Sequence, residues 1–141
     1  MTHAILTLNY LHVLGVTVVG FLLGWLWYSP VLFVKPWLAE MKITEEQMKA
    51  SAQKGMAKFF LSAFLYTFIS TFGLAALLNA HRPTWWGGGA LVGGFVGLCI
   101  VGARFFNGGV WEQRSLRLLA INVGHEVVLF TLQGTLLVVL R

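Results

Sequence analysis

Charged side chains, prolines and cysteines are all scarce in this sequence. Asp, Glu, Lys and Arg make up only 11% of its 141 residues, less than half of the roughly 25% found in ordinary soluble domains. That scarcity excludes most soluble classes of protein. The single cysteine, Cys99, cannot form an intrachain disulfide or a cysteine-based metal site, so we interpret it as a small packing residue.

Motifs of known chemistry are also missing. The sequence has no HExxH element, no paired-cysteine motif and no Gly-Lys-Ser/Thr phosphate loop. It also has no hydrophilic stretch long enough for a catalytic domain. We therefore expect no cofactor, assign no catalytic residue and leave the question of a metal open.

Hydrophobic residues make up 57% of the chain and gather in long runs. Four segments, at about 4–28, 56–79, 86–105 and 115–140, come near the roughly 20 residues that cross a hydrocarbon core as a helix. The alternating pattern of membrane barrel strands is absent. The sequence thus predicts one all-α domain over residues 1–141: an integral membrane four-helix bundle with an interfacial or cytoplasmic segment at about 29–55. The first segment has no basic n-region or cleavage site, so we expect it to be retained.

Basic residues are distributed unevenly among the connections. Eight of the ten lie at the first and third connections: Lys35, Lys42, Lys49, Lys54, Lys58, Arg104, Arg114 and Arg117. Only Arg82 and Arg141 lie at the opposite ends. Because Lys and Arg near helix ends stay on the cytoplasmic side, this bias predicts a multi-pass inner-membrane protein with both termini outside. The formal charge of +5 then reflects topology and contact with anionic headgroups, and we expect no nucleic-acid partner.

Aromatic residues are concentrated where the first apolar segment ends, in the stretch GWLWYSPVLFVKPW at residues 24–37. Such rings are typical of the headgroup level, where their apolar bodies are buried and their N–H or O–H groups stay wet. Pro30 disfavours a helical Ser29 and predicts a helix end near Tyr28. The following segment is expected to lie along the interface or to fold back on the bundle; a ligand-binding role for the rings is the alternative. The predicted interfacial anchors are Trp25, Trp27, Tyr28, Pro30, Phe33 and Trp37.

A helix start is recognisable further along the same loop. Thr44 and Gln47 have the spacing of a capping box, in which each side chain binds the backbone N–H of the other residue. A short cytoplasmic helix is therefore predicted after Thr44, either solvated or binding a partner.

Several of these elements together resemble a known family. The most specific is Trp27-Tyr28-Ser29-Pro30; the others are Leu32-Phe33, Lys35, Trp37, Thr44-Glu45-Glu46, Ile121-Asn122-x-Gly124 and Gly134. Over nearly its whole length the chain resembles the small bacterial membrane proteins called domain of unknown function 1761. The resemblance implies a compact helical membrane protein of bacterial type, and it brings no substrate, reaction or catalytic residue.

Polar groups inside the apolar segments are the candidate functional residues, because each is costly there unless it faces the interior and finds a partner. On the fourth segment Ser115, Asn122, Glu126 and Gln133 fall within about 40° of one another at about 100° per residue, with His125 at the edge of this stripe. The second segment adds hydroxyl groups every four residues, at Ser62, Tyr66 and Ser70.

The first segment supplies a counterpart in Asn9 and His12. From the expected helix heights we predict that His12 approaches Glu126 or Gln133 across the first and fourth helices. The candidate ligand- or ion-binding residues are therefore Asn9, His12, Asn122, His125, Glu126 and Gln133.

These residues admit four interpretations. They could join the helices structurally, relay a proton or ion through Glu126 and a histidine, or hold a metal through His12, His125 and Glu126. The fourth is acid–base chemistry on a lipid-phase substrate, with Arg117 or Arg104 as an anion clamp. Our preferred hypothesis is a non-enzymatic inner-membrane protein whose polar cluster around Glu126 and His12 is structural or binds a ligand. The alternative is a small transporter or channel for protons, metal ions or another solute, and a membrane enzyme acting on lipid or quinone comes third.

Glycines form two rows at helical spacing. Gly89, Gly93 and Gly97 lie on the third segment, and Gly20 and Gly24 on the first. Small residues at this spacing let helix backbones approach closely. The pattern leaves open whether they meet within one chain or between subunits, and since four short crossings enclose little interior, we also expect a homo-oligomer.

Overall fold

The computed structural model describes residues 5–53 and 55–141, which leaves Ala4 and Lys54 outside the described residues. Within these ranges the chain is helical and contains no strand, as the sequence predicts. The elements are α2 (Tyr10–Trp27), α3 (Val34–Met41), α4 (Glu45–Gln53), α5 (Ala57–His81), α6 (Trp86–Phe95), η1 (Val96–Gly102), α7 (Ala103–Trp111) and α8 (Leu116–Val139).

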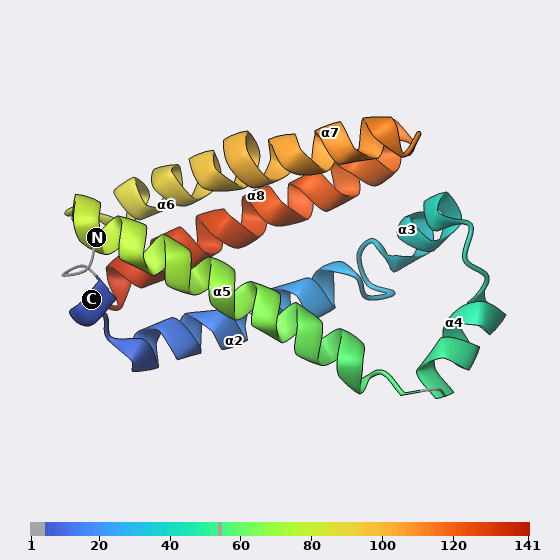
Figure 1. Ribbon diagram of the computed structural model, residues 1–141, viewed down its shortest axis with the longest axis horizontal. Helices are drawn as coiled ribbons and strands as arrows, with labels where there is room; N and C mark the ends of the chain where they lie inside the picture. The colour runs from blue at the N-terminus through green and yellow to red at the C-terminus, as the bar shows by residue number, and fades with distance from the viewer. Residues whose placement is uncertain (1–4, 54) are drawn as a thin grey trace.

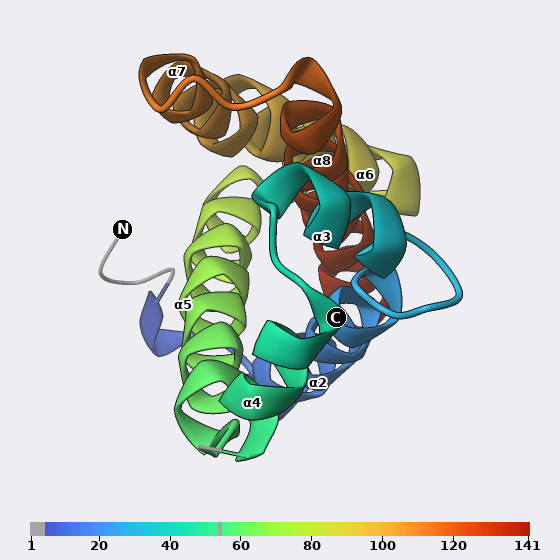
Figure 2. The same cartoon turned by 90° about the vertical axis from the view of Figure 1, so that its right-hand side faces the viewer.

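Four helical units in the described part of the chain are long and apolar enough to cross a membrane: α2, α5, the continuous rod from α6 to α7, and α8. Helix α8 is central, because it packs against α2, α5 and the α6–η1–α7 rod (Figure 1). Viewed along the bundle, α8 lies between this rod and α2, and α5 lies beside α2 (Figure 2). Helix α3 folds back against α8, whereas α4 stands further out at the same end of the molecule.

The first long helix begins later than predicted. It starts at Tyr10 instead of near residue 4, because the Asn9 side chain caps it and accepts from the backbone N–H groups of Leu11 and His12 at 3.1 and 3.3 Å. Asn is among the best N-cap residues, since its oxygen satisfies N–H groups that have no partner inside the helix. Asn9 is thus a cap rather than a side chain at membrane depth. The helix ends at Trp27, one residue before the predicted end.

The third long helix is longer than predicted and changes its winding. It continues to Trp111 instead of ending near residue 105, and Val96–Gly102 forms a π-helix. The glycine row at positions 89, 93 and 97 is continued by Gly102, five residues on, which matches the i→i+5 winding of a π-helix. A Cβ at Gly102 would lie 3.0 Å from the Val123 side chain, so this glycine also faces α8.

The glycine row packs within the chain. A Cβ on Gly89 or Gly93 would overlap the backbone of α8, and one on Gly97 would lie 2.8 Å from the carbonyl oxygen of Glu126. Gly134 on α8 faces Gly89 in the same way. These contacts leave the two backbones no room for even a methyl group between them, so the row sets the distance between the rod and α8.

The polar loop holds the helix start expected from its sequence. The Thr44 N–H donates to Gln47 Oε1 at 3.0 Å, and the Gln47 N–H donates to Thr44 Oγ1 at 3.2 Å, which confirms the capping box. The loop is tied to the bundle by Ser115, whose hydroxyl donates to the Glu40 carboxylate. Ser115 also caps α8, because its oxygen accepts from the Leu118 N–H at 3.1 Å.

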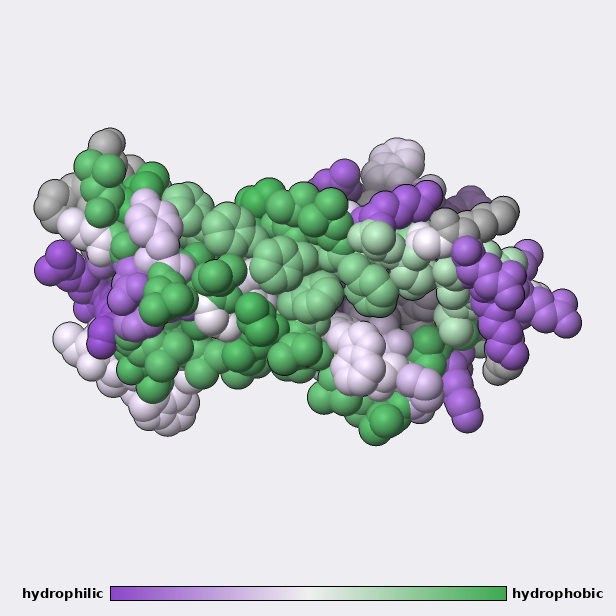
Figure 3. All heavy atoms as spheres, turned by 90° about the horizontal axis from the view of Figure 1, so that it is seen from below, coloured by the Kyte–Doolittle hydropathy of each residue, from purple (hydrophilic) through white to green (hydrophobic). Residues whose placement is uncertain are grey.

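Hydrophobic and hydrophilic residues separate along the long axis. In Figure 3 hydrophobic residues cover most of the middle of the visible face, and hydrophilic ones gather at its two ends. The long helices carry large apolar side chains that point outward, among them Leu91 of α6 at 70% and Ile69 of α5 at 67% exposure. Residues 5–9 and Arg141 lie at the end that carries Arg82, since Thr7 accepts from Asn79 and Arg141 donates to the Pro83 carbonyl oxygen. The opposite end carries α3, α4 and the start of α8.

Candidate functional site

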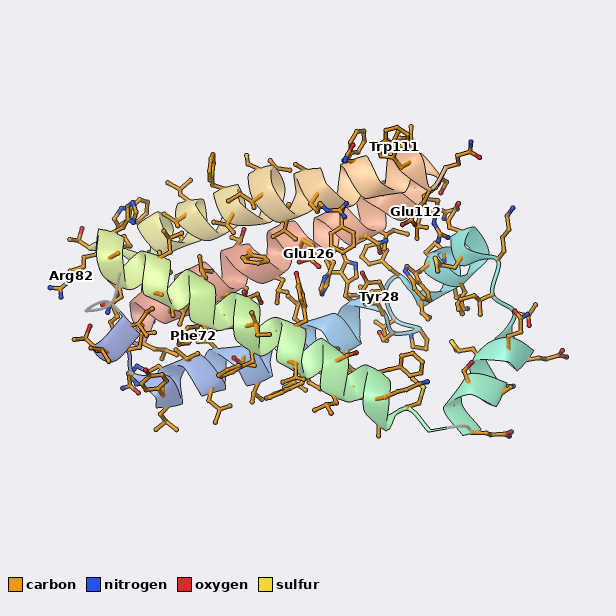
Figure 4. All side chains as sticks on the ribbon, viewed as in Figure 1. Tyr28, Phe72, Arg82, Trp111, Glu112 and Glu126 are labelled. Carbon is orange, nitrogen blue, oxygen red and sulfur yellow. The ribbon has the colours of Figure 1, made fainter. Side chains whose placement is uncertain are left out.

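A buried carboxylate lies at the centre of the molecule. Glu126 on α8 is 4% exposed, and the Tyr66 hydroxyl on α5 donates a hydrogen bond to its Oε2 atom. The neighbouring His125 places its Nδ1 atom 3.1 Å from Oε1. Both carboxylate oxygens are therefore bonded, as a buried acid requires. Figure 4 shows Glu126 between α8 and α5, with Tyr28 nearer the end that carries α3.

His125 is enclosed by rings from the end of α2. Its imidazole lies 5.8 Å from the Trp27 ring and 5.3 Å from the Tyr28 ring, centroid to centroid. Its Nε2 atom is buried without a hydrogen-bond partner among the described residues. A Cβ on Gly24 would lie 3.4 Å from Nε2, so this nitrogen faces α2. If Nδ1 carries the proton that binds Glu126, Nε2 keeps a free lone pair that can accept a proton or a hydrogen bond.

The polar atoms of Trp27 and Tyr28 have hydrogen-bond partners inside the protein. The Trp27 Nε1–H donates to the Ile121 carbonyl oxygen at 3.2 Å, and the Tyr28 hydroxyl donates to Asn122 Oδ1 at 3.1 Å. An aromatic ring with one polar atom can be buried when that atom finds a partner. Burial, and then the charge of Glu126, raise the pKa of the Tyr28 hydroxyl, which keeps its proton on the donor.

The remaining predicted anchors divide between the surface and this ring cluster. Trp25 is 64% exposed, and Pro30 is exposed as well. Phe33 packs on Trp27 at 4.7 Å and Trp37 on Tyr28 at 5.8 Å between ring centroids. The segment after Pro30 was expected either to lie along the interface or to fold back on the bundle. In the structure it folds back, because α3 contacts α8.

We define the acid cluster as Glu126, His125, Tyr66, Tyr28 and Asn122. Three of its residues come from α8, one from α5 and one from the C-terminal cap of α2. The sequence stripe on α8 placed Asn122 and Glu126 together, and the four-residue spacing on α5 singled out Tyr66. The contribution of Tyr28 could not be seen from its sequence position, because it depends on how α2 crosses α8.

A cavity of about 890 Å³ lies next to the acid cluster, at the end of the bundle that carries α3 and α4. Its wall is largely apolar and includes Trp37, Met41, Met48, Phe59 and Phe105. Its polar groups are Tyr28, Asn122, Arg104, Glu112 and Arg114. We call this space the basic-end cavity. Tyr28 and Asn122 belong to both the cavity and the acid cluster, so the cavity reaches the edge of this cluster.

The prediction that His12 approaches Glu126 or Gln133 is wrong. Gly24 is the α2 residue beside His125, and His12 lies about 18 Å further along the helix at about 1.5 Å per residue. His12 instead contacts its own cap, with Asn9 Nδ2 3.3 Å from its Nε2. It lines a separate cavity of about 180 Å³ at the opposite end of the bundle. The error lies in the relative shift of the two helices, because the α2 residue opposite Gln133 is Gly20, eight residues beyond His12.

The predicted metal set does not form, because His12 is remote from His125 and Glu126. Among residues 5–53 and 55–141 no three His, Cys, Asp or Glu side chains are grouped as a metal site would require.

Gln133 has a different partner from the one expected. It is fully buried, and its Nε2–H donates to Thr71 Oγ1 on α5 at 2.8 Å. Its Oε1 atom has no partner in the described part of the chain. Gly20 lies opposite, where a Cβ would be 3.2 Å from Gln133 Nε2.

The buried threonines Thr67 and Thr71 are not among the residues predicted from the sequence. Both hydroxyls bind backbone carbonyl oxygens of α5 itself, at 2.9 and 2.7 Å. Ser62 and Ser70, which were expected inside, bond to carbonyl groups three residues earlier on the same helix. Thr67 and Thr71 are four residues apart, as are the members of the neighbouring stripe Ser62, Tyr66 and Ser70. Because the two stripes have the same spacing, the sequence alone could not show which of them faces the core.

Fold and site together define a class: in the part of the chain that the structure describes, the protein is all-helical, has four helices of membrane-spanning length and is built around a buried carboxylate. The chain belongs to the family described as "Protein of unknown function (DUF1761)", whose model matches residues 11–138, nearly the whole chain. Comparison with curated proteins and with solved structures gave no match.

Proposed function

We propose that this chain is a multi-pass protein of the bacterial inner membrane, a four-helix bundle with both termini outside and its basic loops in the cytoplasm. The apolar middle of the molecule and the four long apolar helices support a membrane location. The excess of Lys and Arg at the α3–α4 end supports the orientation. The proposal includes contact of these loops with anionic headgroups, and association into a homo-oligomer because four helices enclose little interior.

Within that setting the protein acts as a non-enzymatic binding protein for a small ligand. One observation carries this conclusion: the hydrogen-bonded pair Tyr28 and Asn122 lines the basic-end cavity, and the Tyr28 ring contacts His125 of the acid cluster. A ligand in the cavity therefore adjoins groups that contact the buried acid. The cavity volume of about 890 Å³ lies within the range of roughly 300–1,000 Å³ that small-molecule sites occupy.

Structural joining of the helices accounts for only part of this arrangement. The bonds of Glu126 to Tyr66 and His125 do join α5 to α8. A purely structural cluster, however, gains nothing from an adjoining cavity, because unfilled space forfeits packing contacts. Binding explains both the cavity and the polar groups at its inner end.

Filling the cavity tests the proposal. Ala63 on α5 lines the cavity, and Ala80 on the same helix is exposed and does not line it. The wild type, Ala63→Trp and Ala80→Trp proteins are purified in mild detergent and analysed by native mass spectrometry for retained small molecules. We expect retention by the wild type and Ala80→Trp, and loss from Ala63→Trp. Equal retention by all three, or by none, would contradict a binding role for this cavity.

Proton- or ion-coupled transport is the second candidate, and it has an observation of its own. Polar groups continue inward from the acid cluster to the buried Gln133–Thr71 bond, and the smaller cavity lined by His12 lies at the far end of the bundle. The test is pH-gradient-driven ion flux in sealed proteoliposomes, comparing the wild type with Glu126→Gln after circular dichroism shows that both are folded. A flux that requires Glu126 would favour transport, and no flux from either protein would leave the binding role in place.

A further inference from the structure

We propose that the basic-end cavity binds an anionic membrane lipid, with Arg104 holding the headgroup and the apolar wall holding an acyl chain. The inference rests on the proposed function, because it takes this cavity to be a binding site. It adds the chemical class of the ligand and the residue that selects it.

Arg104 lies inside a helix long enough to span the membrane. The sequence placed this residue at the end of the third segment, where its side chain could reach the headgroup level by extending along the helix. The helix in fact continues to Trp111, about 10 Å beyond Arg104 at about 1.5 Å per residue. A guanidinium within a membrane-spanning segment is costly unless it faces a cavity or an opposite charge. Arg104 does line the cavity.

The local sequence gives the Arg104 side chain its position. Gly108 is one turn further along α7, and a Cβ there would lie 3.1 Å from Arg104 Nη1. The guanidinium can therefore lie close over the helix backbone at the cavity wall. A larger residue at position 108 would displace it.

The cavity wall has two cations, Arg104 and Arg114, and of these only Arg104 lacks a carboxylate partner among the described residues. Within the described residues it has no hydrogen bond and no ion pair. Arg114, by contrast, places its Nε atom 3.1 Å from Glu112 Oε2, so the two other charged residues of the wall neutralise each other. One unpaired guanidinium matches a ligand with one negative charge, and guanidinium groups bind phosphate through paired hydrogen bonds.

The rest of the wall favours an amphiphile over a free anion. The same wall also contains Phe105, Phe59, Trp37 and two methionines, Met41 and Met48. Methionine side chains adapt to flexible apolar partners. A soluble phosphate would leave this wall without a partner, whereas an acyl chain covers it. The cavity thus joins a single positive charge to an apolar groove, which is the pattern of an anionic lipid.

The test measures lipid binding to the full-length protein in detergent by native mass spectrometry. The probes are phosphatidylglycerol, phosphatidylcholine with identical acyl chains, and inorganic phosphate. We expect the wild type to bind phosphatidylglycerol about tenfold more tightly than phosphatidylcholine, the factor typical of one charge-assisted contact. Arg104→Gln should abolish this preference. Arg82→Gln, which removes an exposed arginine at the opposite end, should leave it unchanged.

A second variant keeps the proposal testable if Arg104→Gln does not fold. Gly108→Leu retains the charge but displaces the guanidinium, so it should also reduce the preference for phosphatidylglycerol. Equal binding of the two lipids by the wild type, or an unchanged preference in the Arg104→Gln or Gly108→Leu protein, would overturn the inference. Displacement of phosphatidylglycerol by inorganic phosphate at comparable concentration would overturn the lipid assignment and identify a soluble anion as the ligand.

The two proposals fail in different ways. If Ala63→Trp removes lipid but the wild type ignores headgroup charge, the cavity binds a ligand and only the role of Arg104 is wrong. If Ala63→Trp binds phosphatidylglycerol as tightly as the wild type, the cavity is not the site and the proposed function fails as well.

Discussion

The hydroxyl group of Tyr66 on α5 donates a hydrogen bond to the carboxylate of Glu126 on α8 and so joins two helices at the centre of the bundle. The other carboxylate oxygen is occupied by His125. A buried polar group that loses its hydrogen-bond partner is still removed from water, which costs free energy. Removing both carboxylate oxygens of Glu126 should therefore destabilise the protein more than removing only the charge of this side chain.

Replacing Glu126 with leucine should destabilise the protein by about 1–3 kcal/mol, because His125 would stay buried without its acceptor and the bond from Tyr66 that joins α5 to α8 would be lost. Glu126→Gln keeps an acceptor oxygen of the same shape and should cost less. The free energy of unfolding of both variants can be measured by denaturation in detergent. A leucine variant as stable as the wild type would show that the acid does not contribute to helix association.

Replacing Gly93 with alanine should prevent the α6–η1–α7 rod from packing on α8, because the added Cβ would overlap the Phe130 backbone. Overpacking of this kind costs typically 1–3 kcal/mol, and more where backbone must move. Gly73→Ala on α5 is the matched control, since nothing lies within 4 Å of its Cβ. Thermal unfolding should show a lower midpoint for Gly93→Ala and an unchanged or higher one for Gly73→Ala. Equal midpoints would refute close backbone packing at Gly93.

The bond between Gln133 and Thr71 should appear as a coupling between α8 and α5. Thr71→Val and Gln133→Leu each remove one partner, and we expect each to lower the free energy of unfolding by about 0.5–2 kcal/mol. The double variant should lose less than the sum, because no polar atom of the pair is then left alone. A double-mutant cycle gives this coupling directly, and strictly additive losses would argue against the bond.

Sided labelling tests the orientation. In a Cys99→Ser background, Lys49→Cys on α4 should react with a membrane-impermeant thiol reagent only from the cytoplasmic side. Arg82→Cys, at the opposite end of the bundle, should react only from outside. The distribution of basic residues is the reason for this expectation. The reverse pattern of labelling would invert the proposed topology, and labelling of both positions from one side would refute a membrane-crossing α5.

Several features could be predicted from the sequence because they depend on nearby residues. The helical class and the four long apolar segments follow from composition and run length. The start of α4 follows from the Thr44–Gln47 capping box, a contact between residues three apart. The end of α2 follows within one residue from the restriction that Pro30 imposes.

Other local signals were present but outweighed by hydropathy. Asn9 lies between apolar residues, so its role as a cap was hidden in an apparently continuous span. The change from four-residue to five-residue glycine spacing at Gly102 marks the π-helix, and Gly108 and Gly109 obscured the continuation of the helix to Trp111. Hydropathy locates a span to within several residues, whereas a cap fixes its first residue.

The sequence by itself determined the helices, the glycine row and the polar stripe on α8 that contains Asn122 and Glu126, because each arises from spacing along a single segment. Only the tertiary structure decided the partners: Tyr66 and His125 for Glu126, Tyr28 for Asn122, and Thr71 for Gln133. The pairing depends on the relative shift and rotation of packed helices. Since a shift of one turn moves a side chain by about 5.4 Å, more than a hydrogen bond can span, spacing within a helix cannot tell which residue of another helix it will meet.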